Sequence, residues 1–545
     1  MCRSSTCLGS SCPNSLPCKT RHFSFLQETA RFGSEIAACF LILPFYEPGQ
    51  RHDRQLWGRA PLGIGLDFAR QLHQIGRPLA EVRLSEVLAG LSYALDLTEG
   101  QRPGHAVRTC LIGMRIADVV GLTHDQRSAL FYALLMKDLG CSSNAARFAA
   151  LFDADDHHLK AEVKLINWPL ALESFRYVAT NAAPGQFFLR RVWRILAVLF
   201  RGPSGAREVV RTRCERGAEI ARMLGCADET AQAIRSIDEH WDGRGQPYRL
   251  AGEHISLLGR IVGLAQTFEV FFSAYGLRTA YEMASTRRGR WFDPSLVDAL
   301  ESIREDAGFW QWVAEGDGLD LVASLEPADR VMLADEGDLD RVAEAFARVI
   351  DAKSAWTYQH SNGVAQLAVE LGTRLGMSQP ELRELRRAAL LHDLGKLGVS
   401  NLILDKAGTL TDDEFAVMRR HPEHTGRILS RVGCFRHLAF VASSHHERLD
   451  GLGYHQRLGS GHLSLSTRVL CTADICDALR TSRPYRSGLS SERVLDILGR
   501  EVGTAIDPDC FDALQTVLNG MPEDSTGTPA VHMVPALQND YQQAA

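Results

Sequence analysis

The sequence predicts an all-α protein built from two copies of one helical unit. From Leu79 onward, apolar residues recur at intervals of three and four, as on the buried face of an amphipathic helix. Segments in which apolar and polar residues alternate, the pattern of a half-buried strand, are few along the chain. The third observation is an internal duplication, in which the same motifs return in the same order.

The duplication appears as matched residues at matched spacings. Asp138 lies 17 residues after Gly121, and Asp393 lies 17 residues after Gly376. Further matched pairs are His105 with His360, Ala133–Gly140 with Ala389–Gly395, Glu239–Gly245 with Glu447–Gly453, and Phe292–Pro294 with Ile506–Pro508. The chain therefore contains a diverged repeat of one unit.

The matched segments also predict the domain boundaries. Matching positions are 255 residues apart in the early segments and 208 apart in the later ones, which places about 47 extra residues in the first copy, near 150–205. We expect an irregular N-terminal extension, the first copy, an acidic linker or short docking helix, the second copy and a flexible tail, at residues 1–78, 79–310, 311–342, 343–520 and 521–545.

The bulk composition excludes several classes of protein. With 45% hydrophobic and 23% charged residues the chain is globular, and a net charge of -6 offers no general basic surface for nucleic acid. The longest apolar run, Ile36–Tyr46, is too short for the roughly 20 residues of a membrane span. Nine of the 13 cysteines are scattered singly, which indicates free thiols and a cytoplasmic location.

The second copy carries imidazole and carboxylate side chains that fit a metal centre. His392 and Asp393 are adjacent at a helix end, where both can reach one cation and the carboxylate can bridge two. The candidate ligands are His360, His392, Asp393, His421, His445, His446 and Asp474. Mixed ligands of this kind favour a catalytic site over a structural zinc site, and we expect two divalent transition-metal ions from among Fe, Mn, Ni, Co and Zn.

These motifs, in this order, resemble the HD-GYP family of the HD superfamily over most of residues 345–515. The segments that carry the resemblance are His392–Gly398, Lys406–Thr411, His445–Tyr454, Ala473–Leu479 and Arg483–Arg486. The resemblance implies tandem HD-type helical bundles, the first degenerate and the second with an intact metal site. It also implies a metal-dependent phosphodiesterase that converts a cyclic dinucleotide, with cyclic di-GMP as first candidate, to a linear product or mononucleotides.

The resemblance further implies a role for each site residue. The seven candidate ligands become metal ligands, and Asp393 and Lys396 become catalytic residues. The residues expected to face the substrate are Lys396, Tyr454, Arg483, Tyr485 and Arg486. The two arginines suit a phosphodiester because a guanidinium donates two parallel hydrogen bonds to phosphate.

Two positions depart from the family pattern. The Gly-Tyr-Pro of the family is here Gly453-Tyr454-His455, which leaves the substrate less fixed than the metal site. Trp356 stands where some relatives place a glutamate that adds a third ion, so we expect two ions and not three. An HD phosphohydrolase acting on another nucleotide, or a catalytically silent signalling adaptor, is the alternative interpretation.

The first copy retains His105 and Asp138 but has lost the other ligands. Lys137 stands at the position of His392 and Arg213 at that of His421, while Ile237, Asp238 and Gln266 replace His445, His446 and Asp474. A dinuclear site cannot be built from this set, and Lys137 or Arg213 is expected to take the place of a metal and pair with Asp138. We expect a structural or regulatory role, such as binding a signalling protein through residues 79–310, and the sequence is compatible with an oligomer.

Overall fold

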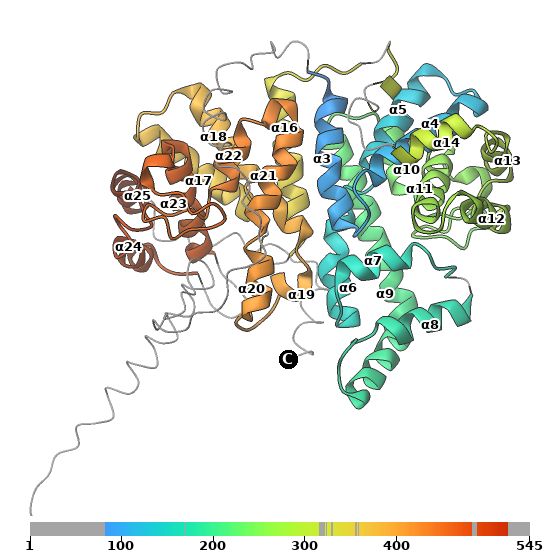
Figure 1. The fold of residues 1–545 in the computed structure, drawn as a ribbon, viewed down its shortest axis with the longest axis horizontal. Coiled ribbons are helices and arrows are strands. Elements are labelled where there is room, and N and C mark those ends of the chain that lie inside the picture. The colour runs from blue at the N-terminus through green and yellow to red at the C-terminus, as the bar shows by residue number, and fades with distance from the viewer. Residues whose placement is uncertain are drawn as a thin grey trace, which may run out of the picture. The chain divides into compact units, whose positions relative to one another are not determined.

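The structure, a computed structural model, describes residues 82–168, 170–315, 322, 324–328, 331–354, 357, 359–481 and 488–520. Every named element within these ranges is an α- or 3-10 helix, and β-structure there is confined to isolated bridges (Figure 1). The all-α prediction is therefore confirmed. The predicted extension over 1–78 and the predicted tail over 521–545 lie outside the described residues.

The first copy follows the chain from α3 to α14. Its helices are α3 Leu84–Thr98, α4 His105–Val120, α5 His124–Met136, η2 Cys141–Asn144, α6 Ala145–Phe152, α7 Asp156–Val163, α8 Ala171–Asn181, α9 Phe188–Met223, α10 Asp228–Arg235, η3 Gly252–His254, α11 Leu257–Tyr275, α12 Leu277–Arg287, α13 Pro294–Ser302 and α14 Ala307–Glu315.

The second copy repeats this order without the insertion. Its helices are α16 Glu336–Asp351, α17 His360–Arg374, α18 Gln379–Leu391, η4 Leu394–Gly398, α19 Asn401–Leu404, α20 Asp412–Met418, α21 His421–Arg431, η5 Gly433–Phe435, α22 Leu438–Ser443, η6 Ser460–His462, α23 Leu465–Arg480, α24 Ser491–Gly499 and α25 Pro508–Gly520. In the first copy α4 packs on α5 and α11, and in the second α17 packs in the same way on α18 and α23. The tandem arrangement is confirmed.

A glycine fixes the turn that follows the third helix of each bundle, α5 or α18. A Cβ on Gly395 would lie 1.9 Å from the carbonyl oxygen of His421, and a Cβ on Gly140 would lie 1.9 Å from that of Arg213. Only glycine allows the backbone to approach so closely. The turn that carries His392 and Asp393 is thereby held against the start of α21.

The insertion of the first copy is itself helical. It consists of α6, α7, α8 and the first half of α9, which pack around a small core of their own that includes Phe152, Leu159, Tyr177 and Val198. The segment 311–342, expected to be a linker or docking helix, contains the end of α14 and the beginning of α16. Glu336 and Asp340 of α16 pair with Arg387 on α18, whose side chain is buried.

One apolar helix of the first copy has the length of a membrane span. Among the described residues α11 alone is long and apolar enough by length and composition, and 61% of its apolar window is buried. It packs against α4, α5, α10 and α12. These contacts identify α11 as the central core helix of the first copy.

A buried polar cluster joins the insertion to the second copy. The Nζ of Lys353 lies 3.0 Å from Oδ2 of Asp156 on α7, and the backbone N–H of Asn401 donates to Oδ1 of Asp156 at 2.8 Å. Nε2 of His157 lies 3.1 Å from the carbonyl oxygen of Leu397 in η4. Lys353 and Asp156 are both fully enclosed, and burial lowers the pKa of Lys353 to about 8. The insertion therefore contacts the turn that carries the candidate catalytic residues.

Replacing Asp156 with alanine is expected to destabilise the protein by about 3–5 kcal/mol, because it leaves the ammonium of Lys353 buried without its partner. Urea unfolding measures the loss. His158→Ala on the exposed side of the same helix is the control and should change stability by no more than about 0.5 kcal/mol. Equal effects of the two substitutions would show that the cluster adds no stability.

Candidate metal centre

The seven predicted ligands lie together in the second copy, six of them at or just beyond the ends of helices. His360 begins α17, His392 and Asp393 follow α18, and His421 begins α21. The remaining three are His445 and His446, which follow α22, and Asp474, which lies inside α23. All are buried except His446, which is half-buried. The bundle thus directs helix termini, where side chains leave the regular packing, toward one point.

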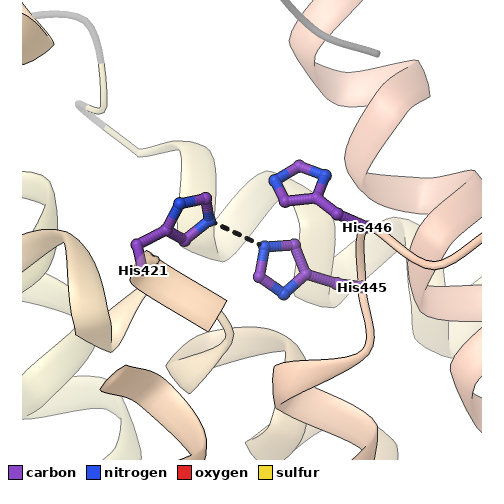
Figure 2. A group of neighbouring side chains, drawn as sticks. All are labelled: His421, His445 and His446. Carbon is purple, nitrogen blue, oxygen red and sulfur yellow. Dashed lines mark hydrogen bonds between the residues drawn. The ribbon is translucent and has the colours of Figure 1, made fainter. Parts of the chain in front are cut away.

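The ligand atoms form two groups. In the first group Nε2 of His360 lies 3.2 Å from Oδ1 of Asp474, and Nε2 of His392 lies 3.7 Å from the same oxygen. The second group contains His421, His445 and His446 (Figure 2), with all three ligand atoms within 4.8 Å of one another. Each group is close enough to share one cation.

Asp393 stands between the two groups and presents one carboxylate oxygen to each. Its Oδ2 lies 3.3 Å from Nε2 of His392 and 3.8 Å from Nε2 of His360. Its Oδ1 lies 3.4 Å from Nε2 of His421 and 3.7 Å from Nε2 of His445. This is the geometry of a carboxylate that bridges two ions.

Backbone carbonyls fix the orientation of three of the imidazoles. Nδ1 donates to the carbonyl oxygen three residues earlier in His392, His421 and His445, at 2.7, 2.7 and 2.6 Å. A carbonyl can only accept, so Nδ1 carries the proton and Nε2 offers its lone pair to the centre. The Nε2 atoms of His421 and His445 face each other at 3.1 Å (Figure 2). A cation between them would relieve the repulsion between their lone pairs.

The donor set fits a metal by its unsatisfied atoms as well. Oδ1 of Asp393 and Nε2 of His392 are buried and have no hydrogen-bond partner among the residues that the structure describes. Buried polar atoms normally have a partner, and both of these are electron-pair donors aimed at the centre. These residues therefore could hold metal ions.

The electrostatics of the centre divide its histidines into two sets. Burial lowers the pKa of His421 and His445 far below its usual value and that of His446 to about 3, so these three rings are neutral. Although burial alone raises the pKa of Asp393, the charges of His392 and Lys396 hold it well below its usual range. Although burial alone lowers the pKa of His360 and His392, neighbouring carboxylates raise it, to about 10 for His360, so a metal ion would have to displace a proton from these two rings.

Two residues expected at the substrate side lie beside the centre. Nζ of Lys396 lies 2.5 Å from Oδ2 of Asp393. The ring of Tyr454 lies against the ring of His446, with centroids 4.8 Å apart. The guanidinium of Arg419 also lies over the Tyr454 ring, 4.9 Å from its centroid. The peptide bond from Tyr454 to His455 is cis.

Several predicted positions cannot be placed. Arg483, Tyr485 and Arg486 lie outside the described residues, as does Trp356. Their expected roles stay predictions.

Sequence reasoning missed two residues that support the ligands. Oδ2 of Asp477 lies 2.7 Å from Nδ1 of His360, the interaction that carbonyls supply to the other rings. The hydroxyl of Thr425 donates to the carbonyl oxygen of His392 at 2.8 Å and accepts from the N–H of Gly395 at 2.8 Å. Both follow a ligand on the same helix by one turn, and that spacing was the available signal.

The first copy fills the corresponding space with cations of its own. Lys137 pairs with Asp138, as predicted, and both side chains are buried. Nζ of Lys164, which follows α7, lies 3.7 Å from Oδ1 of Asp138 and 2.7 Å from Oε2 of Glu99. Although burial alone raises the pKa of Asp138, the two lysines lower it.

Other parts of the first copy differ from expectation. Arg213 pairs with Asp238 and not with Asp138, because the loss of both histidines at 237 and 238 leaves the Asp238 carboxylate beside it. His105 keeps the orientation of a ligand, with its Nδ1 bonded to Glu269. The shell around the ancestral site is thus preserved while the ligands are replaced.

Comparisons with known proteins agree with this geometry. A family model described as HD domain matches residues 204–296 and 344–510. The 3'3'-cGAMP-specific phosphodiesterase 3 of Vibrio cholerae serotype O1 is 41% identical over 446 residues, which are 82% of this chain and 97% of the relative. A cyclic di-GMP phosphodiesterase of Thermotoga maritima is 32% identical over 180 residues, 33% of this chain and 49% of the relative.

A solved structure matches over nearly the same range. It is the crystal structure of a cyclic GMP-AMP specific phosphodiesterase of V. cholerae, with a TM-score of 0.56 and 37% sequence identity. The match covers 81% of this chain and 99% of the other.

Replacing Asp477 with alanine is expected to weaken metal binding about 10- to 100-fold, because His360 loses the partner that orients it. Titration of the metal-stripped protein with Mn²⁺ or Zn²⁺ measures the affinity. Asp496→Ala, at an exposed carboxylate on α24, is the matched control. Unchanged affinity in Asp477→Ala would remove the orienting role from this residue.

Proposed function

The chain belongs to the HD-GYP family of HD-domain phosphodiesterases, and we propose that its second copy hydrolyses a cyclic dinucleotide with the aid of two divalent metal ions. The observation that carries this proposal is the position of Asp393, with one carboxylate oxygen directed at each of two histidine groups. A shared carboxylate between two ligand sets is the arrangement that a phosphodiester displacement requires of a two-ion site.

The first candidate substrate is 3'3'-cGAMP, which takes precedence over the cyclic di-GMP expected from the sequence. The relative whose printed name carries that specificity matches 82% of this chain, a share that requires both copies. The cyclic di-GMP phosphodiesterase of T. maritima matches 33%. Cyclic di-GMP is the second candidate, because both dinucleotides offer the same phosphodiester linkages to the centre.

The protein's own residues supply the following chemistry. His360, His392 and Asp474 would hold one ion, His421, His445 and His446 the other, and Asp393 both. Two bound ions neutralise phosphate oxygens and make a water more acidic. Lys396, whose Nζ pairs with Oδ2 of Asp393 at 2.5 Å, could donate a hydrogen bond from its ammonium to a phosphate oxygen or to the departing oxygen.

Residues beside the metal centre would recognise the base and the second phosphate of the substrate. Tyr454 offers an aromatic face beside His446, on which a base can stack. Arg483, Tyr485 and Arg486 are proposed to contact the phosphodiester, on the strength of the family resemblance. The first copy, which lacks the ligands, is proposed to be structural and regulatory, and residues 79–310 are a proposed surface for a signalling protein.

The proposed location is the cytoplasm. All eight cysteines among the described residues are free thiols. Free thiols persist in a reducing compartment.

His392→Ala and Asp393→Ala are each expected to lower kcat/KM for 3'3'-cGAMP at least about 100-fold, because each removes a ligand of the centre. Hydrolysis is followed by chromatography of the linear product, with metal content measured on the same samples. His437→Ala is the matched control, since His437 is an exposed histidine that pairs with Glu384.

The same assay separates the alternatives. Faster turnover of cyclic di-GMP than of 3'3'-cGAMP would reverse the order of the two substrates. Metal bound by the intact protein without hydrolysis of either would contradict the proposal and favour another nucleotide or an adaptor.

A further inference from the structure

The insertion of the first copy presents a broad apolar face to solvent. Along the first half of α9, Leu189, Trp193, Leu196 and Phe200 recur at intervals of four, three and four, so they share one side of the helix. The exposed fractions of Leu189, Trp193 and Phe200 are 80%, 70% and 84%. Side chains of this size are rarely left exposed together on a soluble protein.

The apolar face continues onto the neighbouring helix. α8 packs beside α9 (Figure 1), and its Leu172 and Phe175 are also exposed. We call the set Leu172, Phe175, Phe188, Leu189, Trp193 and Phe200 the insertion face. No element among the described residues covers these six side chains.

The insertion face is not an unfilled part of the local core. The inner sides of α8 and α9 are already used, because Tyr177 and Val198 are buried in the small core with Phe152 and Leu159. The hydroxyl of Tyr177 donates to the carbonyl oxygen of Leu159 at 2.9 Å. The outer apolar side is therefore additional to what the fold of the insertion requires.

Positive charge accompanies the insertion face. Residues 187–207 contain five arginines and no acidic residue, in a chain whose net charge is -6. Arg190 and Arg194 directly follow Leu189 and Trp193, so they line one edge of the apolar stripe. Their guanidinium groups contact Asp153 and the carbonyl oxygen of Ala150, at 3.0 and 3.2 Å, and Arg190 remains largely exposed.

This combination distinguishes between possible occupants. A second copy of the chain would place arginines of like charge along the same apolar stripe, which opposes association. A surface of anionic lipid headgroups complements the arginines, while its acyl boundary accepts tryptophan, phenylalanine and leucine. The charge pattern therefore favours a membrane over self-association.

We propose that the insertion face is a docking surface for an anionic phospholipid membrane. α8 and the first half of α9 lie along the interface, with Leu189, Trp193 and Phe200 at the acyl boundary and Arg190 and Arg194 at the headgroups. The contact is peripheral and uses no membrane-spanning helix. It does not depend on the phosphodiesterase activity.

Flotation of the full chain with vesicles tests the proposal. The protein is expected to float with vesicles of phosphatidylethanolamine and phosphatidylglycerol, and to bind phosphatidylcholine vesicles at least about tenfold more weakly. The double variant Leu189→Gln/Trp193→Gln should bind the anionic vesicles at least about tenfold more weakly, because it loses two apolar contacts. Raising the salt concentration should also weaken binding.

Matched variants distinguish binding through the insertion face from nonspecific hydrophobic adsorption to vesicles. Tyr275→Gln removes another exposed aromatic side chain of the first copy, at the end of α11, and should float like the unchanged protein. Leu172→Gln/Phe175→Gln on α8 repeats the test if the α9 variant misfolds, which circular dichroism detects.

Three results would overturn the proposal. The first is that the unchanged protein floats with neither kind of vesicle. The second is that it floats equally with the anionic and the phosphatidylcholine vesicles. The third is a dimer, seen by analytical ultracentrifugation, that the α9 variant dissociates while vesicle binding is absent. The third result would make the insertion face a surface for a second copy.

Discussion

The structure depends on a buried carboxylate that follows the third helix of each bundle, α5 or α18. Asp393 in the second copy and Asp138 in the first are enclosed among helix ends, and both are held in their ionised form. A buried charge is tolerated only when cations or hydrogen bonds compensate it. The turn that carries it is fixed by Gly395 or Gly140, which allow the backbone to approach α21 or α9 closely. What compensates the carboxylate therefore determines what each copy can do.

The two copies meet this requirement in different ways. Around Asp393 stand the ammonium of Lys396 and four imidazoles whose Nε2 atoms converge on the carboxylate, where metal ions could add positive charge. Around Asp138 the ammonium groups of Lys137 and Lys164 supply it. A lysine side chain compensates the carboxylate but cannot activate a water as a metal does. The absence of the predicted ligands from the first copy is thus compatible with a stable bundle, which remains in contact with the candidate catalytic turn through Asp156 and Lys353.

The sequence was sufficient for the fold and for the convergence of the ligands. Spacing identified His392 and Asp393 as candidate ligands because a recognisable motif directly follows a segment with the apolar spacing of a helix. It did not identify Lys164, since the insertion has no partner in the second copy with which to compare it. It left Lys137 and Arg213 as alternative partners of Asp138, and the structure pairs Lys137 with Asp138 and Arg213 with Asp238, because the choice between nearby carboxylates depends on side-chain packing. Asp477 was missed because a residue that supports a ligand has no motif of its own apart from its helical spacing.

The most direct test of this account is the location of metal in crystals of the intact chain, by anomalous diffraction at the absorption edge of the bound element. The account predicts two peaks in the second copy, one on each side of Asp393, and none beside Asp138. A peak beside Asp138, or a second copy with no metal after growth in metal-supplemented medium, would contradict it.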